Sequence, residues 1–384
     1  MKDGFRVVDS DGHVIEPHHI WHDYLDAEFR HRAPRPVGMT FGFEFEGFTV
    51  NLPSSWSPDA TDAEVAHRSE RVQATYAELF PDAYAQGFSA EAQLADMDRE
   101  GVDRAVLYPS FGLFVLASDD VEPALAAAVC RAYNDWLAEF CGTDPSRLSG
   151  AAMVPMQDPR RAAAEVQRAA GMGFPGVYIR PNPVGGRNLD DPALDPLWDA
   201  MSGLGLTLGI HEGGFPNLPQ VVRGRLNDPE QAHVCFHPME QMIAAVSLVY
   251  GGVLERFPGL RVGFLEAGCG WVPFWLHRMD EHWENSTGKD FGAARSLSMP
   301  PSEYFRRQCF VSTDADERML AQVIELIGDD RIVFSTDYPH PDSQWPHAVE
   351  SFLALPGVSD GSKRRILWDN ALAMYGLEVE AHAR

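Results

Sequence analysis

The chain has 384 residues, and its 56 acidic and 31 basic side chains give a formal net charge of −25. This acidity argues against binding to nucleic-acid phosphates and to anionic membranes, and no apolar run is long enough for a transmembrane helix or a signal peptide. The five cysteines are scattered without a CxxC pair, which is typical of reduced thiols and favours a cytoplasmic protein.

Short β-rich runs recur along the chain, and helical patterns separate them. The predicted strands are Phe5–Asp9, Val102–Tyr108, Ser149–Val154, Gly176–Ile179, Leu206–Ile210, Arg261–Leu265, Cys309–Ser312 and Arg331–Ser335. The predicted helices cover 90–99, 121–140, 158–171, 238–257, 272–284, 315–327, 347–355 and 359–375, and another follows Asp191–Pro192. Repeated strand-then-helix units predict an α/β fold, the (β/α)8 TIM barrel. A doubly wound sheet is the alternative, but the phosphate loop typical of it is missing, because no GxGxxG or GxxxxGK[ST] motif occurs.

The connections between these units differ in length. Residues 31–88 form a long insertion after strand one, rich in Pro, Gly and aromatic side chains, of the kind that serves as a lid. Further excursions occur at 212–236 and 285–304. Loops after strands lie on the catalytic face of a barrel, so all three should cover one mouth. We expect a single domain over residues 1–384.

The first strand leads into the polar sequence DSDGH. Because alternate side chains of a strand share a face, Asp9, Asp11 and His13 are expected to point together into the barrel mouth. Two acids and an imidazole that converge are typical of a metal site. The alternative is a tight turn, since Asp-Gly is a common turn pair.

Three further strands end in side chains that bind metals. His211 ends strand five, Glu266 follows strand six, and Asp337 follows strand eight. Each has a structural alternative, such as a salt bridge between Glu266 and Arg180. The carboxyl ends of parallel strands meet at one end of a barrel, so the sequence predicts one metal centre there. His237, at the start of the helix predicted after strand five, either joins this centre or faces solvent.

Six motifs resemble the amidohydrolase-related family that includes aminocarboxymuconate-semialdehyde decarboxylase and the resorcylate-type decarboxylases. They are DSDGHVIEP (9–17), GIHEGG (209–214), HPMEQM (237–242), GGVLERFPGLRVGFLEAGCGWVPFWLHRMDEH (251–282), STDYPHPD (335–342) and DNALAMYGL (369–377). They span nearly the whole chain, and the fold that the resemblance implies is again the (β/α)8 barrel.

The resemblance also implies a ligand set: H-x-H or E-x-H on strand one, His on strands five and six, and Asp on strand eight. His13, His211 and Asp337 match this pattern. Two positions depart from it. Asp11 is the first ligand of strand one, and Glu266 stands where the decarboxylases use a histidine as acid and base.

These departures, with His237 as an extra histidine, favour one hypothesis. Three imidazoles and three carboxylates exceed what one tetrahedral Zn²⁺ needs and suit two iron ions, or iron with manganese. A branch of the family then implies a nonheme dinuclear iron monooxygenase, which uses O₂ to hydroxylate a small or apolar carboxylic acid or its thioester. Its metal ligands would be Asp11, His13, His211, His237, Glu266 and Asp337, with His237, Glu266 and Asp337 also catalytic.

The alternative hypothesis is a mononuclear hydrolase or decarboxylase with one divalent metal such as zinc. Asp337 would act as a base towards metal-bound water, with His237 or His340 as its proton partner. A third hypothesis, a metal-free binding subunit on the same fold, would need a broken ligand set, and the set is intact.

The expected partner is a small-molecule substrate. Arg180 at the end of strand four could pair with a substrate carboxylate, and His340, Tyr108 and Phe111 are the other candidate substrate-binding residues. The two aromatic rings could instead pack the insertion against the barrel rim. A homodimer through barrel-side helices is a possible assembly.

Overall fold

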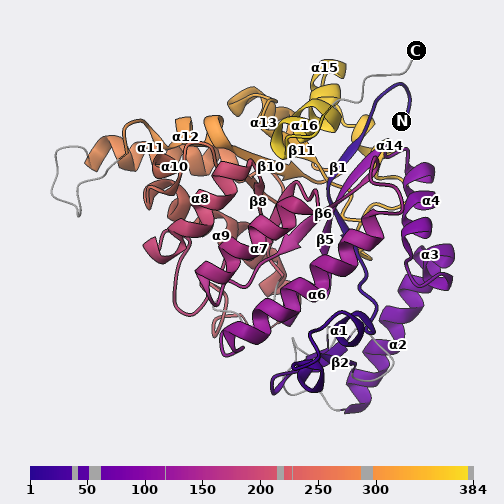
Figure 1. Cartoon of the computed structure of the whole chain (residues 1–384). Helices are drawn as coiled ribbons and strands as arrows, with labels where there is room; N and C mark the ends of the chain where they lie inside the picture. The colour runs from indigo at the N-terminus through magenta and orange to yellow at the C-terminus, as the bar shows by residue number, and fades with distance from the viewer. Residues whose placement is uncertain are drawn as a thin grey trace.

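Eight parallel strands form a nearly closed barrel with helices around it, as the sequence predicted (Figure 1). The computed structural model describes residues 1–36, 42–51, 62–116, 118–213, 220–226, 228–286 and 297–378. In hydrogen-bonding order the strands are β1 (Val8–Val14), β5 (Arg104–Pro109), β6 (Leu148–Met153), β7 (Gly176–Ile179), β8 (Thr207–Ile210), β9 (Arg261–Phe264), β10 (Cys309–Thr313) and β11 (Ile332–Phe334). Every neighbouring pair is parallel, so all the carboxyl ends lie at the same end of the barrel.

Helices follow most of the strands and cover the outside of the barrel. The longer ones are α4 (Ala90–Glu100), α6 (Pro123–Cys141), α7 (Pro159–Gly171), α8 (Asp195–Leu204), α9 (Pro229–Tyr250), α11 (Val272–Ser286), α12 (Pro301–Gln308) and α13 (Leu320–Ile327). Shorter ones are α1 (Ile20–Asp23), α5 (Gly112–Val115), α10 (Val253–Arg256), α14 (Ala348–Leu353), α15 (Asp360–Arg364) and α16 (Asn370–Tyr375). Asp158 caps α7 as expected, because its carboxylate accepts from the backbone N–H groups of Arg160 and Arg161.

Helix α9 begins earlier than the sequence predicted. Pro238 was expected to open this helix, but α9 starts at Pro229, where the carboxylate of Asp228 accepts from the N–H of Gln231 at 2.9 Å. Pro238 therefore lies inside the helix, and His237 lies two turns from its start. The Asp-Pro pair that marks a helix start occurs at both α7 and α9.

The first strand extends further than predicted, because the polar DSDGH sequence is part of it. A bulge interrupts its register against β5 between Asp9 and Gly12. An extra residue in a strand ends the simple alternation of faces. The expectation that Asp9 shares a face with Asp11 and His13 is therefore wrong. The carboxylate of Asp9 instead accepts hydrogen bonds from Thr336, which follows β11.

That contact belongs to the seam where β1 and β11, the edge strands of the described ladder, face each other. Asp9 accepts from the N–H of Thr336 at 3.0 Å and from its hydroxyl. The hydroxyl of Ser335 donates to the carbonyl of Asp11 at 3.1 Å, and the N–H of His13 donates to the carbonyl of Tyr338 at 2.7 Å. Side-chain and backbone hydrogen bonds together thus close the barrel at this seam.

The described parts of the insertion after β1 pack near the carboxyl ends of the strands. They comprise the small antiparallel sheet β2 (Arg35–Pro36), β3 (Gly42–Phe45) and β4 (Phe48–Asn51), with α2 (Asp62–Leu79) and α3 (Pro81–Ala85). Residues 37–41 and 52–61 of the insertion lie outside the described residues. Phe80 contacts Tyr338, with ring centroids 5.4 Å apart, and Trp345, with centroids 6.1 Å apart.

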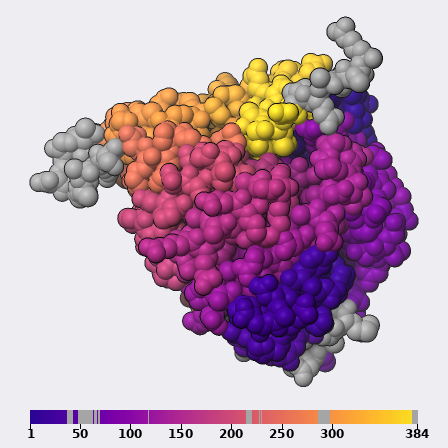
Figure 2. Space-filling model, viewed as in Figure 1, coloured from indigo at the N-terminus to yellow at the C-terminus, as the bar shows by residue number. Residues whose placement is uncertain are grey.

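The start of the chain is visible at both ends of the molecule. In Figure 2 indigo atoms lie at the top right, near the N-terminus, and again at the bottom, where the segment after β1 emerges. The chain therefore crosses the barrel once as β1 before the insertion begins. Within the described ranges, no helix is both long and apolar enough to span a membrane.

Candidate metal centre

The ends of β1 and β8 bring three metal-binding side chains together inside the barrel. Asp11 and His13 come from β1, and His211 directly follows β8. The two Nε2 atoms of His13 and His211 lie 3.1 Å apart. Oδ1 of Asp11 lies 3.8 Å from Nε2 of His211 and 4.0 Å from Nε2 of His13. All three side chains are buried.

Two more carboxylates reach the same histidines from β9 and β11. Oε2 of Glu266 lies 2.6 Å from Nε2 of His211, and Oδ1 of Asp337 lies 3.5 Å from Nε2 of His13. Nε2 of His237, on α9, lies 3.9 Å from Oε1 of Glu266. The structure thus brings all six residues that the sequence singled out as ligands into one cluster.

A backbone contact orients His13. Its Nδ1 lies 3.0 Å from the carbonyl of Pro109. A carbonyl only accepts, so Nδ1 carries the hydrogen and Nε2 of the neutral ring presents its lone pair to the cluster. Burial lowers the pKa of His13 well below its ordinary value, which keeps the ring neutral.

Burial has the opposite effect on the acids. It raises the pKa of Asp11 well above its ordinary value, and the carboxylates of Glu266 and Asp337 nearby add to this. Burial, with the charge of Asp337, also raises the pKa of Glu266. Oδ1 of Asp11 is buried and has no hydrogen-bond partner among the described residues. The cluster therefore resists holding its negative charge without a cation.

The backbone turns sharply at both of the carboxylates that follow β9 and β11. Glu266 has φ of 52° and Asp337 has φ of 57°, a left-handed conformation that costs about 1–3 kcal/mol for such residues. The hydroxyl of Ser312 accepts from the N–H of Glu266 at 3.1 Å, and that of Ser335 accepts from the N–H of Asp337 at 3.2 Å. These bonds hold the turns at the edge of the cavity that both residues line.

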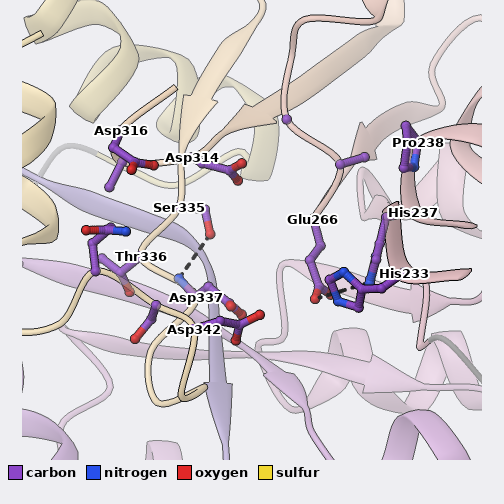
Figure 3. Close-up of a pocket in the computed structure, with 15 residues that line it drawn as sticks. His233, His237, Pro238, Glu266, Asp314, Asp316, Ser335, Thr336, Asp337 and Asp342 are labelled. Atoms are coloured by element: carbon purple, nitrogen blue, oxygen red, sulfur yellow. Dashed lines mark hydrogen bonds and ion pairs between the residues drawn. The ribbon is translucent and has the colours of Figure 1, made fainter. Parts of the chain in front are cut away.

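This cavity, of about 280 Å³, opens at the carboxyl ends of the strands. Its lining residues are His233, His237, Pro238, Glu266, Ala267, Gly268, Asp314, Ala315, Asp316, Ser335, Thr336, Asp337, Asp342, Ser343 and Gln344. Figure 3 shows His233, His237 and Glu266 on one side, facing Asp337 and Asp342 on the other. Five of the lining residues are acids and none is Lys or Arg.

Of the predicted substrate-binding residues, His340 lies closest to the cluster. Its Nδ1 lies 2.7 Å from Oδ1 of Asp337, and its Nε2 lies 3.0 Å from the hydroxyl of Ser110. Burial opposes protonation of this ring, but the charge and hydrogen bond of Asp337 raise the pKa of His340 to about 9.

None of the four predicted substrate-binding residues is among those that line the cavity. Arg180 donates to the carbonyls of Leu116 at 3.0 Å and Pro183 at 2.8 Å and pairs with Asp119. Phe111 is buried, and its backbone N–H donates to the carboxylate of Glu16 at 2.9 Å.

Tyr108 is buried inside the barrel, beneath the two histidines. Its ring stacks on His211 with centroids 6.0 Å apart, and its hydroxyl bonds that of Tyr375 at 2.9 Å. A Cβ at position 209 would overlap the Tyr108 hydroxyl, so β8 has Gly209 at this point.

Sequence reasoning missed Asp314. It directly follows β10, as His211 directly follows β8, so the same signal could have found it. Burial, followed by the charges of Glu317 and Asp337, raises the pKa of Asp314 to about 7.

Two sets of ligand atoms are close enough to hold one metal ion. One consists of Asp11, His13 and His211, and the other of His13, Asp337 and His340, with all ligand atoms of a set within 4.8 Å of one another. Two imidazole nitrogens with carboxylate oxygens are a donor set that divalent transition metals bind. The residues present therefore fit a divalent cation at the point where these sets share His13.

Comparison with known proteins gives relatives over most of the chain. It is 29% identical over 296 residues to 2-amino-3-carboxymuconate-6-semialdehyde decarboxylase of Dictyostelium discoideum, covering 75% of this chain and 77% of that protein. It is 27% identical over 294 residues to gamma-resorcylate decarboxylase of Polaromonas sp. strain JS666, covering 73% and 85%.

A solved structure agrees over nearly the whole length. It is 5-carboxyvanillate decarboxylase of Novosphingobium aromaticivorans DSM 12444, complexed with manganese and 4-hydroxy-3-methoxy-5-nitrobenzoic acid. Its TM-score is 0.69 at 21% identity, and the match covers 98% of this chain and 97% of that one.

These relatives correct the reaction that the sequence favoured. The hypothesis of a nonheme dinuclear iron monooxygenase is wrong, because the relatives are named as decarboxylases. The departures at Asp11 and Glu266, with His237 as an extra histidine, suggested a second metal and an oxidative reaction. The two iron ions and O₂ were expected only for that reaction, and none of these relatives supports them.

The family model described as Amidohydrolase matches residues 8–377. This span contains all eight barrel strands and every residue of the cluster at their carboxyl ends. The chain belongs to the amidohydrolase family, as its motifs predicted.

Proposed function

We propose that the protein is a metal-dependent decarboxylase of a small carboxylic acid, with one divalent cation held by Asp11, His13, His211 and Asp337. The observation that carries this proposal is the convergence of these side chains at the carboxyl ends of β1, β8 and β11, together with relatives named as decarboxylases.

The electrostatics of the cluster support a cation there. Two neutral imidazoles face carboxylates whose ionisation burial makes costly, and Asp11 has an unpaired oxygen. A divalent ion would compensate this charge and satisfy these lone pairs. Manganese is the ion named for the structurally similar 5-carboxyvanillate decarboxylase. Zinc is the ion that the alternative, mononuclear hypothesis named from the sequence. When bound, the cation supplies a Lewis acid that binds and polarises the substrate carboxylate.

Decarboxylation leaves an electron pair on carbon, so the reaction needs a proton donor. Glu266 lines the cavity at the position where the resemblance implies a histidine. Burial raises the pKa of Glu266 well above its ordinary value, which favours the protonated carboxyl group, so a glutamic acid can replace that histidine as proton donor. His237, 3.9 Å away, can pass a proton to Glu266, and His340 holds Asp337 in place.

We infer that the substrate enters through the acidic cavity and that the aromatic ring of Tyr108 supports the metal site. Tyr108 stacks under His211 and would fix its ring. Arg180 is held by backbone carbonyls and Asp119, so a role in substrate binding would need these bonds to open. The cytoplasmic location, the absence of nucleic-acid partners and the homodimer stay predictions.

Metal content tests whether the cluster binds one divalent cation. Protein loaded with Mn²⁺ or Zn²⁺ and freed of excess metal should retain about one ion per chain by elemental analysis. Asp11→Ala and His211→Ala should lose it, since each removes one ligand of the set formed by Asp11, His13 and His211. The exposed His22→Ala on α1 is the matched control and should keep the ion. Full occupancy in both ligand variants would contradict the proposed site.

The reaction is tested by release of CO₂. The loaded protein is assayed with a panel of hydroxybenzoates and unsaturated carboxylic acids, and with esters and amides of the same acids. We expect CO₂ from an acid, and Glu266→Gln should reduce kcat by about 10²-fold or more while metal content is retained. Turnover of an ester or amide without CO₂ would instead assign the protein to the hydrolases.

A further inference from the structure

The HPMEQM motif of α9 contains a buried amide that the proposed reaction does not use. This residue, Gln241, is fully buried. Its Nε2 donates to the carbonyl of Ile210 at 2.8 Å and to that of Leu265 at 2.9 Å. Ile210 directly precedes His211, and Leu265 directly precedes Glu266. One amide group therefore binds both strands at the residue before a member of the cluster.

We propose that Gln241 is a positioning residue, whose amide fixes the ends of β8 and β9 so that His211 and Glu266 meet. This inference rests on the proposed metal-dependent function, because it concerns the same site. Gln241 itself contacts neither side chain. It acts through the backbone that carries them.

The strand ladder ends where Gln241 binds. Leu265 donates its N–H to the carbonyl of Ile210 at 3.0 Å, which is the last bond from the backbone of β8 to that of β9 among the described residues. The next residue, Glu266, turns away with φ of 52°, and its N–H goes to Ser312 on β10. Beyond Leu265 no backbone hydrogen bond of the ladder joins the ends of β8 and β9 among the described residues. The amide of Gln241 joins them there, because it donates to the carbonyls of both Ile210 and Leu265.

The carbonyl of Ile210 accepts two of these bonds, one from Leu265 and one from Gln241, and so uses both of its lone pairs. Oε1 of Gln241 has no hydrogen-bond partner among the described residues. The side-chain amide therefore uses only its NH₂ group, as expected of a residue whose role is to bridge two carbonyls. An apolar side chain of the same size could fill the space but could not bridge them.

The helix face that bears Gln241 also supplies His237. The two residues are four positions apart in α9, so they lie on the same face, one turn from each other. Nε2 of His237 lies 3.9 Å from Oε1 of Glu266, and the amide of Gln241 donates to the carbonyl of Leu265, the residue before Glu266. One helix face thereby sets the relative places of His237, His211 and Glu266.

The chain offers a matched control for this contact. Gln308 is also buried, and its Nε2 also bridges two carbonyls, those of Phe257 at 2.9 Å and Leu260 at 3.0 Å. These carbonyls precede β9, at the opposite end of that strand from Glu266. Gln308→Met removes the same kind of bridge as Gln241→Met, but away from the cluster.

The experiment compares the two variants by thermal unfolding, by crystal structure and by Mn²⁺ affinity in competition with a chelator. Both should lower Tm by a similar amount, since each leaves two buried carbonyls short of a donor. Only Gln241→Met should lengthen the distance between Nε2 of His211 and Oε2 of Glu266 and weaken Mn²⁺ binding by about 10-fold or more. Gln241→Asn, whose shorter amide reaches one carbonyl, should show the same change in smaller measure and serves if the methionine variant does not fold.

Two results would overturn the inference. One is an unchanged His211–Glu266 distance in a variant at position 241. The other is an equal loss of Mn²⁺ affinity in Gln308→Met. If the wild-type protein bound no Mn²⁺, the proposed function would fail, while the distance between His211 and Glu266 in metal-free crystals would still decide the role of Gln241.

Discussion

Glu16 is a buried carboxyl group that shapes the mouth without joining the metal cluster. Its oxygens accept from the backbone N–H groups of Ser110 at 3.2 Å, Phe111 at 2.9 Å and Gly112 at 2.8 Å. Ser110 and Phe111 connect β5 to α5, and Gly112 is the first residue of α5. Glu16 therefore anchors the loop after β5 to the end of β1, and its lone pairs are already engaged.

Burial raises the pKa of Glu16 to about 7, although the backbone N–H groups oppose the shift. The folded protein then holds a proton that the unfolded chain, with a pKa near 4.5, has already lost. Stability from this group is complete below about pH 4.5 and is lost as the pH rises to about 7. We predict that Glu16→Gln flattens this part of the curve of unfolding free energy against pH, as measured by urea unfolding at several pH values.

The same variant should cost about 1–3 kcal/mol at low pH, because an amide offers one acceptor oxygen where the carboxyl group serves three donors. The exposed Glu325→Gln is the control, and its curve should match that of the wild type. A wild-type slope that persists in Glu16→Gln would assign the pH dependence to another group.

At the scale of elements, α2 and α3 attach the insertion to the loop after β11. Phe80, between these two helices, is almost fully buried. It packs edge-on against Tyr338 and also against Tyr76 and Phe88. Tyr338 lies one residue after Asp337, so this aromatic cluster supports the segment that carries a proposed ligand.

Phe80→Ala should therefore destabilise the protein by about 3–5 kcal/mol, the usual cost of removing a buried ring. Hydrogen exchange should become faster in 335–345 as well as in α2 and α3, because the loop loses its packing partner. Phe274→Ala, at a ring that is 61% exposed, should change neither quantity. A loss of stability with unchanged exchange in 335–345 would show that the insertion does not support the loop.

The elements themselves were largely predictable from the sequence. Strands such as Gly176–Ile179 are buried on both faces and therefore appear as short continuous apolar runs. The resemblance and the residues that follow these strands also indicated the cluster. Polar residues in the middle of an element were harder to place. DSDGH contains the Asp-Gly pair of a turn, yet it lies in β1, where it pairs with β5.

Other features depend on contacts between distant segments. The bulge that separates Asp9 from Asp11 is set by pairing with β5 and by Thr336. The bridge made by Gln241 requires β8 and β9 to end side by side. Neither has an unambiguous local signal, because Gln is common on helices and the Asp-Gly pair at the bulge is equally typical of a turn.

At the scale of the whole molecule, the charge of −25 and the acid-lined cavity act in the same direction. An anionic substrate approaches against this field, and salt screens it within a Debye length of about 8 Å at physiological ionic strength. We therefore predict that kcat/KM for a carboxylic acid rises severalfold between low and physiological salt, while kcat changes little.

Asp316→Asn and Asp342→Asn should weaken this salt dependence, since both residues line the cavity and lie at its rim. Glu325→Gln on α13, which removes the same charge away from the cavity, should leave the slope unchanged. Equal effects of all three variants would attribute the dependence to net charge alone.

The seam of the barrel has a consequence for how the protein is made. Asp9 and Thr336 are 327 positions apart, and the proposed ligands lie beside them on β1 and β11. A ribosome therefore delivers Asp11 and His13 long before it delivers Asp337. A chain that stops before β11 lacks a proposed ligand and the closing strand together. The barrel closes and the site is completed only once β11 and Asp337 have been made, so the order of the strands delays metal capture until that point of translation.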